Sequence, residues 1–295
     1  MRVLIDGVGY YVYAEGTGPA VLLLHGFAGS SEMWRPFLGD WGQLFTAVAV
    51  DLPGHGCSDC PSEVARYRME AVCNDLVRVL DALGLDRIHL AGYSMGGRIA
   101  LSLALLHPGR VKRLVLESAS PGLADPDERA RRQESDEAWA RFIEKAGMPA
   151  FVDRWERQPL FASQNRLPLE IRGRLRQMRL AQPPQGLAAT LRQLGTGRQP
   201  SWWNRLPEMT APCLLISGAL DRKFARLAAE MATKMRTSAQ TAVVPGAGHA
   251  VHLEAPERFS SLVAAFLGQG GEAGDDGQST RNRPAIGPTG KESRT

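Results

Sequence analysis

Short apolar runs alternate with segments of helical pattern through the first half of the chain. This alternation is typical of a parallel sheet whose strands are joined by crossover helices. Most of the runs end in turn residues such as Gly26 and Gly92, and residues 70–83 and 97–107 between them have the apolar spacing of helices. The runs expected to form buried strands are 21–24, 47–51, 88–91 and 111–117. The sequence therefore predicts an α/β fold with a mostly parallel central sheet flanked by helices.

A helix-rich segment interrupts this alternation. Between about residues 127 and 194 the sequence is rich in Arg and helix formers and contains no strand-like run. Strand patterns return at 213–217 and 241–244, and residues 256–267 have the pattern of a final helix. We therefore expect an α/β core of residues 1–121 and 206–267, with a helical cap of residues 122–205 inserted before the last strands.

Composition excludes several classes of protein. The 295 residues include 35 Lys and Arg and 31 Asp and Glu, which gives a net charge of +4. The electrostatic field of so small a charge is too weak to favour binding of nucleic acid. No uncharged apolar run approaches the roughly 18 residues of a membrane span, and the N-terminus lacks the apolar segment of a signal peptide. Four cysteines in so long a chain do not make a disulfide framework. We expect a cytoplasmic globular protein, with a disordered tail at 268–295, where apolar residues are almost absent.

The pentapeptide Gly92-Tyr93-Ser94-Met95-Gly96 lies between a predicted strand and a predicted helix. Small residues around the serine allow the tight turn of a nucleophile elbow, which exposes a serine hydroxyl at the end of a strand. The alternative is a glycine-rich turn in which the serine is incidental. The strand–turn–helix context favours the elbow, with Ser94 as its reactive residue.

A reactive serine needs a proton acceptor and a group that orients this acceptor. Asp221 follows the predicted strand 213–217, and His249 follows the last predicted strand. Loops after parallel strands lie at one edge of a sheet, so both residues are expected near Ser94. The order Ser, Asp, His is the one that this class of sheet enzyme uses. We therefore predict a Ser94–Asp221–His249 triad, with His252 as the alternative base.

His25-Gly26-Phe27 ends another predicted strand. A glycine there lets the backbone turn its N–H groups toward the serine, so we expect the N–H groups of Phe27 and Met95 to form an oxyanion hole. The alternative is an ordinary turn after a core strand. His25 is expected to be structural rather than catalytic.

Cys57 and Cys60, with His55 nearby, could suggest a metal or redox site. Zinc needs about four ligands, and no second pair with suitable spacing is present in the sequence. We expect no metal.

Arg98 is more informative, because it lies four residues after Ser94 and on the same side of a helix. A guanidinium there suits a carboxylate, which it can bind with two hydrogen bonds, better than an apolar ester.

Together, His25-Gly26-Phe27, the DLPGHG sequence at 51–56, the Ser94 elbow, Asp221 and His249 resemble the α/β-hydrolase superfamily over residues 1 to about 267. Further segments narrow this resemblance to the 2-succinyl-6-hydroxy-2,4-cyclohexadiene-1-carboxylate synthase family (MenH family) of menaquinone biosynthesis. These segments are Gly92-Tyr-Ser-Met-Gly-Gly-Arg98, Glu117-Ser-Ala-Ser-Pro-Gly122, Trp155-Glu-Arg-Gln-Pro-Leu-Phe161 and Lys223-Phe224.

The resemblance implies a lyase that eliminates pyruvate from a small-molecule polycarboxylate and uses no cofactor. It also implies that Ser94 acts as a base rather than as an acylated nucleophile. The residues that it places at substrate carboxylates are Tyr93, Arg98, Arg132 and Arg179. Trp155 and Phe161 are expected to wall the pocket, although core packing explains them equally well. The oligomeric state is left open, and a monomer is compatible with the sequence.

Two other functions are compatible with the same residues. The first is a hydrolase of the same fold, which would cleave an ester or a carbon–carbon bond through an acyl-enzyme. The second is a ligand-binding protein without catalytic activity. An intact Ser, Asp and His set argues against the second, because binding alone does not require all three.

Overall fold

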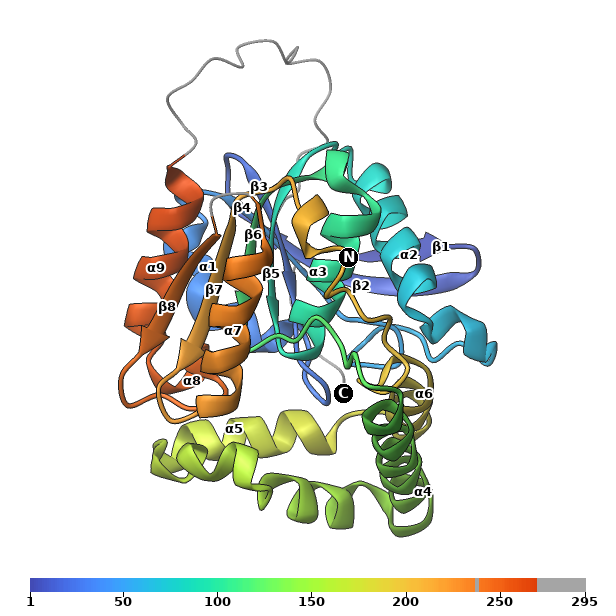
Figure 1. Cartoon of the computed structure of the whole chain (residues 1–295). Coiled ribbons are helices and arrows are strands. Elements are labelled where there is room, and N and C mark those ends of the chain that lie inside the picture. The colour runs from blue at the N-terminus through green and yellow to red at the C-terminus, as the bar shows by residue number, and fades with distance from the viewer. Residues whose placement is uncertain (237–238, 270–295) are drawn as a thin grey trace.

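The computed structural model describes residues 1–236 and 239–269. Its centre is an eight-stranded sheet with the order β1-β2-β4-β3-β5-β6-β7-β8 (Figure 1). The strands are β1 (Arg2–Ile5), β2 (Val8–Glu15), β3 (Ala20–Leu24), β4 (Thr46–Val50), β5 (Ile88–Tyr93), β6 (Val111–Glu117), β7 (Cys213–Gly218) and β8 (Ala239–Val244). Strands β3 to β8 pair in parallel, whereas β2 pairs antiparallel with both β1 and β4. The predicted α/β fold with a mostly parallel sheet is confirmed.

Helices cover both faces of this sheet (Figure 1). Alternate side chains of each strand point to opposite faces, so Leu22 and Leu24 pack with α2 and α3, whereas Val21 and Leu23 pack with α1 and α9. The helices are α1 (Arg35–Trp41), α2 (Met69–Ala82), α3 (Met95–Leu106), α4 (Pro126–Glu156), α5 (Leu169–Leu180), α6 (Pro184–Leu194), α7 (Arg222–Lys234), α8 (Val251–Glu254) and α9 (Pro256–Gly268).

Strands β1 and β2 lie outside the predicted strands. They form an antiparallel hairpin at one edge of the sheet, and β1 alternates exposed and buried residues. A strand of this kind lacks the continuous apolar run that marks a central parallel strand. The two strands therefore give a weaker sequence signal than β3 to β6, which are buried on both faces.

The helices α4, α5 and α6 lie together at one end of the sheet (Figure 1). They fall within the range predicted for the cap, as does the 3₁₀ helix η4 (Pro159–Arg166). Helix α4 is broken at Gly147, which has a φ of 76°. A separate apolar cluster joins α4 and α6, and it includes Ala28 from the loop after β3. The cap is thus anchored on a loop of the core.

Most of the segment expected to be a disordered tail, residues 270–295, lies outside the described residues. Gly268, its first residue, is the last residue of α9. No helix in the described part of the chain has the length and apolar character needed to cross a bilayer.

Candidate active site

Ser94 occupies a sharp turn between β5 and α3. Its φ of 51° and ψ of −105° place it in a backbone region that residues other than glycine rarely adopt. The turn is held at its N–H, which donates to the carbonyl oxygen of Glu117 over 2.8 Å. Strained backbone of this kind is concentrated at functional sites. The turn leaves the Ser94 side chain half-buried and facing a cavity.

Two glycines allow α3 to approach the sheet closely enough for this turn. A side chain at Gly96 would overlap the carbonyl oxygen of Leu24 on β3, and one at Gly92 would overlap the carbonyl oxygen of Gly96. Backbone atoms cannot give way as a flexible side chain does. The spacing of the two glycines around Ser94 is therefore required by the local packing.

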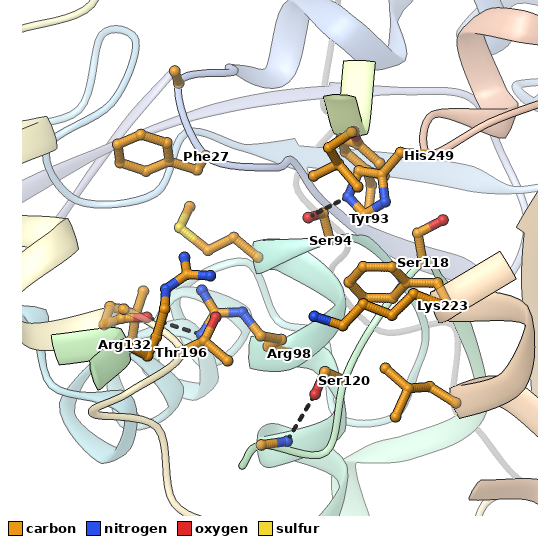
Figure 2. Close-up of a pocket in the computed structure, with 18 of the residues that line it drawn as sticks. Phe27, Tyr93, Ser94, Arg98, Ser118, Ser120, Arg132, Thr196, Lys223 and His249 are labelled. Carbon is orange, nitrogen blue, oxygen red and sulfur yellow. Dashed lines mark hydrogen bonds between the residues drawn. The ribbon is translucent and has the colours of Figure 1, made fainter. Parts of the chain in front are cut away.

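The structure brings Ser94, His249 and Asp221 together, and Figure 2 shows the contact between Ser94 and His249. Ser94 Oγ lies 3.0 Å from His249 Nε2, and His249 Nδ1 lies 2.7 Å from Asp221 Oδ2. Asp221 therefore accepts a hydrogen bond from Nδ1–H, which leaves Nε2 free to accept the Ser94 hydroxyl proton. Asp221 is fixed in turn because its Oδ1 accepts the Phe224 N–H at the start of α7, over 3.2 Å.

His252 does not face Ser94. It is buried between the rings of Trp34 and Tyr93, and its Nδ1 lies 2.9 Å from both carboxylate oxygens of Glu117. The Glu117 carboxylate also accepts the His252 backbone N–H, over 3.0 Å. Glu117 thus holds the backbone of Ser94 through its carbonyl oxygen and the segment just after His249 through its carboxylate.

A cavity of about 850 Å³ lies between the core and the cap. Every predicted site residue except Asp221, which lies behind His249, contributes to its wall. These lining residues are Phe27, Tyr93, Ser94, Met95, Arg98, Arg132, Trp155, Phe161, Arg179 and His249.

The two residues predicted to form the oxyanion hole, Phe27 and Met95, line the same cavity as Ser94. Met95 is the first residue of α3, and the first N–H groups of a helix have no partner within it. Phe27 lies in the loop after β3, which is held by hydrogen bonds to buried side chains. Asp51 Oδ1 accepts the Ser31 N–H over 2.6 Å, and His25 Nε2 accepts the Leu52 N–H over 3.0 Å.

His25 forms its hydrogen bonds with backbone atoms, and its ring packs against His55 with 5.1 Å between the ring centroids. Its Nδ1 donates to the carbonyl oxygen of Gly26, 2.8 Å away, while Nε2 serves as the acceptor for Leu52. Burial lowers the pKa of His25, which favours this neutral form. The side chain therefore joins the loops after β3 and β4 and takes no part in the cavity wall.

Arg98 is a buried cation beside the serine. Its Nη1 donates to the carbonyl oxygen of Leu194 over 2.9 Å and to Gln199 Oε1 over 3.0 Å. Within residues 1–236 and 239–269, no carboxylate forms an ion pair with it. Burial, with a smaller effect of Arg132, lowers the pKa of Arg98 to about 10. The guanidinium therefore stays charged at neutral pH and can bind an anion in the cavity.

Arg132 and Arg179 reach the cavity from the cap and already have acidic partners. Arg132 Nε lies 2.8 Å from Asp136 Oδ1. Arg179 donates to Glu156 Oε1 over 2.9 Å and to Gln164 Oε1 over 3.1 Å. Each guanidinium has further N–H groups with which it could bind a ligand.

Trp155 and Phe161 contribute both to the wall of the cavity and to packing between the cap and the core. Their rings lie 5.7 Å apart, and Trp155 also packs against Phe27, at 5.2 Å between ring centroids. Both residues line the cavity. The same aromatic cluster that packs the cap on the core therefore also forms the cavity wall.

The cavity also contains polar residues to which the sequence analysis assigned no function. Lys223 reaches it from the first turn of α7. Ser118 follows β6 directly, has a φ of 48° and is buried, and its Oγ has no hydrogen-bond partner within the described residues. Their position in the sequence could have identified them as site residues, because polar residues just after β6 and β7 lie at the same edge of the sheet as Ser94.

Cys57 and Cys60 are exposed. They lie in the loop after β4, where Asp51 Oδ2 accepts the Cys57 N–H over 2.7 Å. Over the described ranges 1–236 and 239–269 there is no cluster of three or more His, Cys, Asp or Glu residues that could hold a metal ion.

Comparison with known proteins places this geometry in a family. Residues 19–256 match the α/β hydrolase fold family. A 2-succinyl-6-hydroxy-2,4-cyclohexadiene-1-carboxylate synthase from Pectobacterium atrosepticum is 34% identical, over 84% of this chain and 94% of the relative. A Bacillus subtilis protein that carries the same synthase name provisionally is 44% identical, over 89% of this chain and 96% of the relative.

A solved structure, that of MenH from S. aureus, superposes with a TM-score of 0.83 at 35% identity and covers 88% of this chain and 97% of its own. The chain belongs to the MenH family of 2-succinyl-6-hydroxy-2,4-cyclohexadiene-1-carboxylate synthases. The resemblance predicted from the sequence is confirmed. The match to the α/β hydrolase fold family spans the Ser94 elbow, the cap and the His249 loop, since these all lie within residues 19–256.

The packing around the elbow generates a prediction. Replacing Gly96→Ala puts a Cβ against the Leu24 carbonyl oxygen, so α3 must shift and carry Ser94 and Met95 with it. We expect kcat/KM to fall at least about 100-fold, because small displacements of reacting groups have effects of this size. Gly109→Ala, where nothing lies within 4 Å of the added carbon, is the matched control and should leave kcat/KM unchanged. Equal rates for the two variants would contradict the packing argument.

Proposed function

We propose that the chain eliminates pyruvate from 2-succinyl-5-enolpyruvyl-6-hydroxy-3-cyclohexene-1-carboxylate and forms 2-succinyl-6-hydroxy-2,4-cyclohexadiene-1-carboxylate. The observation that carries this proposal is the buried Arg98 cation, which shares the cavity with the Ser94–His249 pair and forms no ion pair within the described ranges. The proposed substrate carries three carboxylates. Membership in the MenH family supports the same activity.

The hydrogen-bond chain of Ser94, His249 and Asp221 supplies the base. His249 Nε2 accepts the Ser94 hydroxyl proton, and the Asp221 carboxylate stabilises the imidazolium that forms. Ser94 Oγ can then remove the ring proton next to the succinyl ketone. The electron pair moves through the ring double bond and breaks the bond between the ring and the enolpyruvyl oxygen. The departing enolate takes up one proton and becomes pyruvate, which balances the proton removed from the ring.

Negative charge develops on the succinyl ketone oxygen as the ring proton leaves. Phe27 and Met95 line the cavity with Ser94, and we assign their backbone N–H groups to bind this oxygen. Donors fixed by the fold stabilise such charge without reorganisation during the reaction. In this mechanism no acyl-enzyme forms, because Ser94 accepts a proton and does not attack a carbonyl carbon.

Substrate recognition is assigned to the arginines and aromatic residues of the cavity. Arg98, Arg132 and Arg179 bind carboxylates, and Tyr93 lies beside the base, with its ring centroid 5.5 Å from that of His249. Burial raises the pKa of Tyr93, so its phenol stays protonated and able to donate. Trp155 and Phe161 pack against the apolar part of the cyclohexene ring.

A hydrolase remains the alternative, because the same three residues can form an acyl-enzyme. The position of Arg98 argues against an apolar ester as substrate, since a buried guanidinium without an anion is costly to keep beside it. A serine-directed phosphonate tests the alternative, because a hydrolase is labelled readily at its nucleophile.

The experiment that tests the proposed function measures pyruvate release from freshly prepared substrate against the uncatalysed rate, with a nitrophenyl ester in parallel. We expect rapid pyruvate release and little ester cleavage. Ester cleavage without faster pyruvate release would refute the lyase and support the hydrolase.

Substitution of Ser94 tests its function as the base. Ser94→Ala should lower kcat by about three orders of magnitude or more, because the proton acceptor is lost. Substrate binding should persist, since the arginines are untouched, and it can be measured by calorimetry with the dicarboxylate product. A variant that turns over as fast as the wild type would remove Ser94 from the mechanism.

Arg98→Ala should raise KM and lower kcat/KM by about 100-fold, a loss typical of a buried charge-assisted hydrogen bond. The matched control is Arg198→Ala, because Arg198 is exposed and lies outside the cavity wall. Unchanged kcat/KM in the Arg98 variant, with normal unfolding by circular dichroism, would assign this arginine a structural function only.

A further inference from the structure

Lys223 is a cation of the cavity to which nothing above assigns a function. It lies in the first turn of α7, two residues after Asp221. Its side chain is exposed yet lines the cavity, and Figure 2 shows its amino group directed into the space near Arg98 and below Ser94. Its Nζ lies 5.8 Å from the ring centroid of Phe224.

The amino group of Lys223 is not paired with a carboxylate among the described residues. In the two described ranges, no Asp or Glu forms an ion pair with its amino group, in contrast to Arg132 with Asp136 and Arg179 with Glu156. An exposed lysine could project into solvent, where its charge is well hydrated. Here it points into a cavity that also contains Arg98, so an anion bound there would relieve the repulsion between the two cations.

The backbone of Lys223 is fixed relative to the base. Asp221 accepts the Phe224 N–H over 3.2 Å, and the Phe224 ring packs against His249 with 4.7 Å between the ring centroids. The residue between them therefore cannot move without disturbing the orientation of His249. The backbone from which the Lys223 side chain extends into the cavity is therefore fixed relative to the base.

Lys223 and Arg98 occupy different depths of the cavity. Arg98 is buried, with 9% of its surface exposed, whereas Lys223 is exposed. Arg132 lies on the side of the view away from Lys223 (Figure 2). A lysine offers a hydrated ammonium on a flexible side chain, whereas a buried arginine can bind a carboxylate with two hydrogen bonds. A group that leaves the cavity first is therefore better bound by the lysine near solvent than by the buried arginine.

We propose that Lys223 binds the carboxylate of the departing enolpyruvyl group, while the arginines hold the two carboxylates that stay on the ring product. This inference rests on the proposed function. In this binding mode the ammonium is placed beside the oxygen that gains negative charge as its bond to the ring breaks, and it stabilises the leaving group electrostatically. The bonds that form and break are those of the elimination described above.

The test compares Lys223→Met with Arg222→Met. Arg222 is the adjacent exposed cation in the same turn of α7 and does not line the cavity, so this control removes one positive charge at almost the same place. For the Lys223 variant we expect kcat/KM for pyruvate release to fall about 10- to 100-fold. The control should stay within about twofold of the wild type, and Lys223→Arg should recover much of the loss.

Inhibition by the dicarboxylate product distinguishes which carboxylate Lys223 binds. This product lacks the pyruvate carboxylate, so its inhibition constant should be the same for Lys223→Met and for the wild type. A parallel rise in that constant would show that Lys223 binds a retained carboxylate and would overturn the inference. An unchanged kcat/KM would overturn it as well.

The wild-type rate separates the two proposals. Wild-type protein that does not accelerate pyruvate release would refute the proposed function itself. Wild-type activity together with an unaffected Lys223→Met variant would refute the inference about Lys223 alone.

Discussion

The left-handed turn at Ser94 is the constraint on which the rest of the site depends. It exists because Gly92 and Gly96 allow α3 to close on β3 and β5, and because Glu117 on β6 binds the Ser94 N–H. The carboxylate of the same glutamate binds His252, three residues after His249. One buried residue therefore fixes the serine and the segment that carries its partner histidine, which lie 155 positions apart in the chain.

The cap contributes charge in two ways. On its outer surface, pairs such as Arg141–Glu137 and Arg174–Glu170 are exposed and add little stability, because water screens them. Toward the cavity, Arg179 has only 9% of its surface exposed and therefore interacts more strongly with a bound anion, whereas Arg131 and Arg132 are exposed. The arginine-rich composition of the cap is thus explained mainly by ordinary surface pairing, and only Arg131, Arg132 and Arg179 of its arginines line the cavity.

The sequence predicted the parts of the structure that depend on local pattern. Continuous apolar runs identified β3 to β6, and the rule that parallel strands end at one edge predicted the meeting of Ser94, Asp221 and His249. The hairpin of β1 and β2 gave a weaker signal because an edge strand alternates its burial. Arg132 and Arg179 followed from resemblance alone, since no local pattern distinguishes them from neighbouring arginines. Lys223 required the structure, because its direction relative to the cavity depends on how α7 is capped by Asp221.

The contact between Arg179 and Glu156 has a consequence for selectivity. The cation is already neutralised by a carboxylate of the protein when the cavity holds no ligand. An arriving carboxylate at this position therefore shares the guanidinium with Glu156 and gains less than it would at an unpaired cation. Such a site binds weakly matched anions poorly, because Glu156 already neutralises the charge that would attract them. Arg98, which has no such competitor among the described residues, discriminates less and attracts more strongly, so affinity and selectivity for carboxylates are divided between the core and the cap.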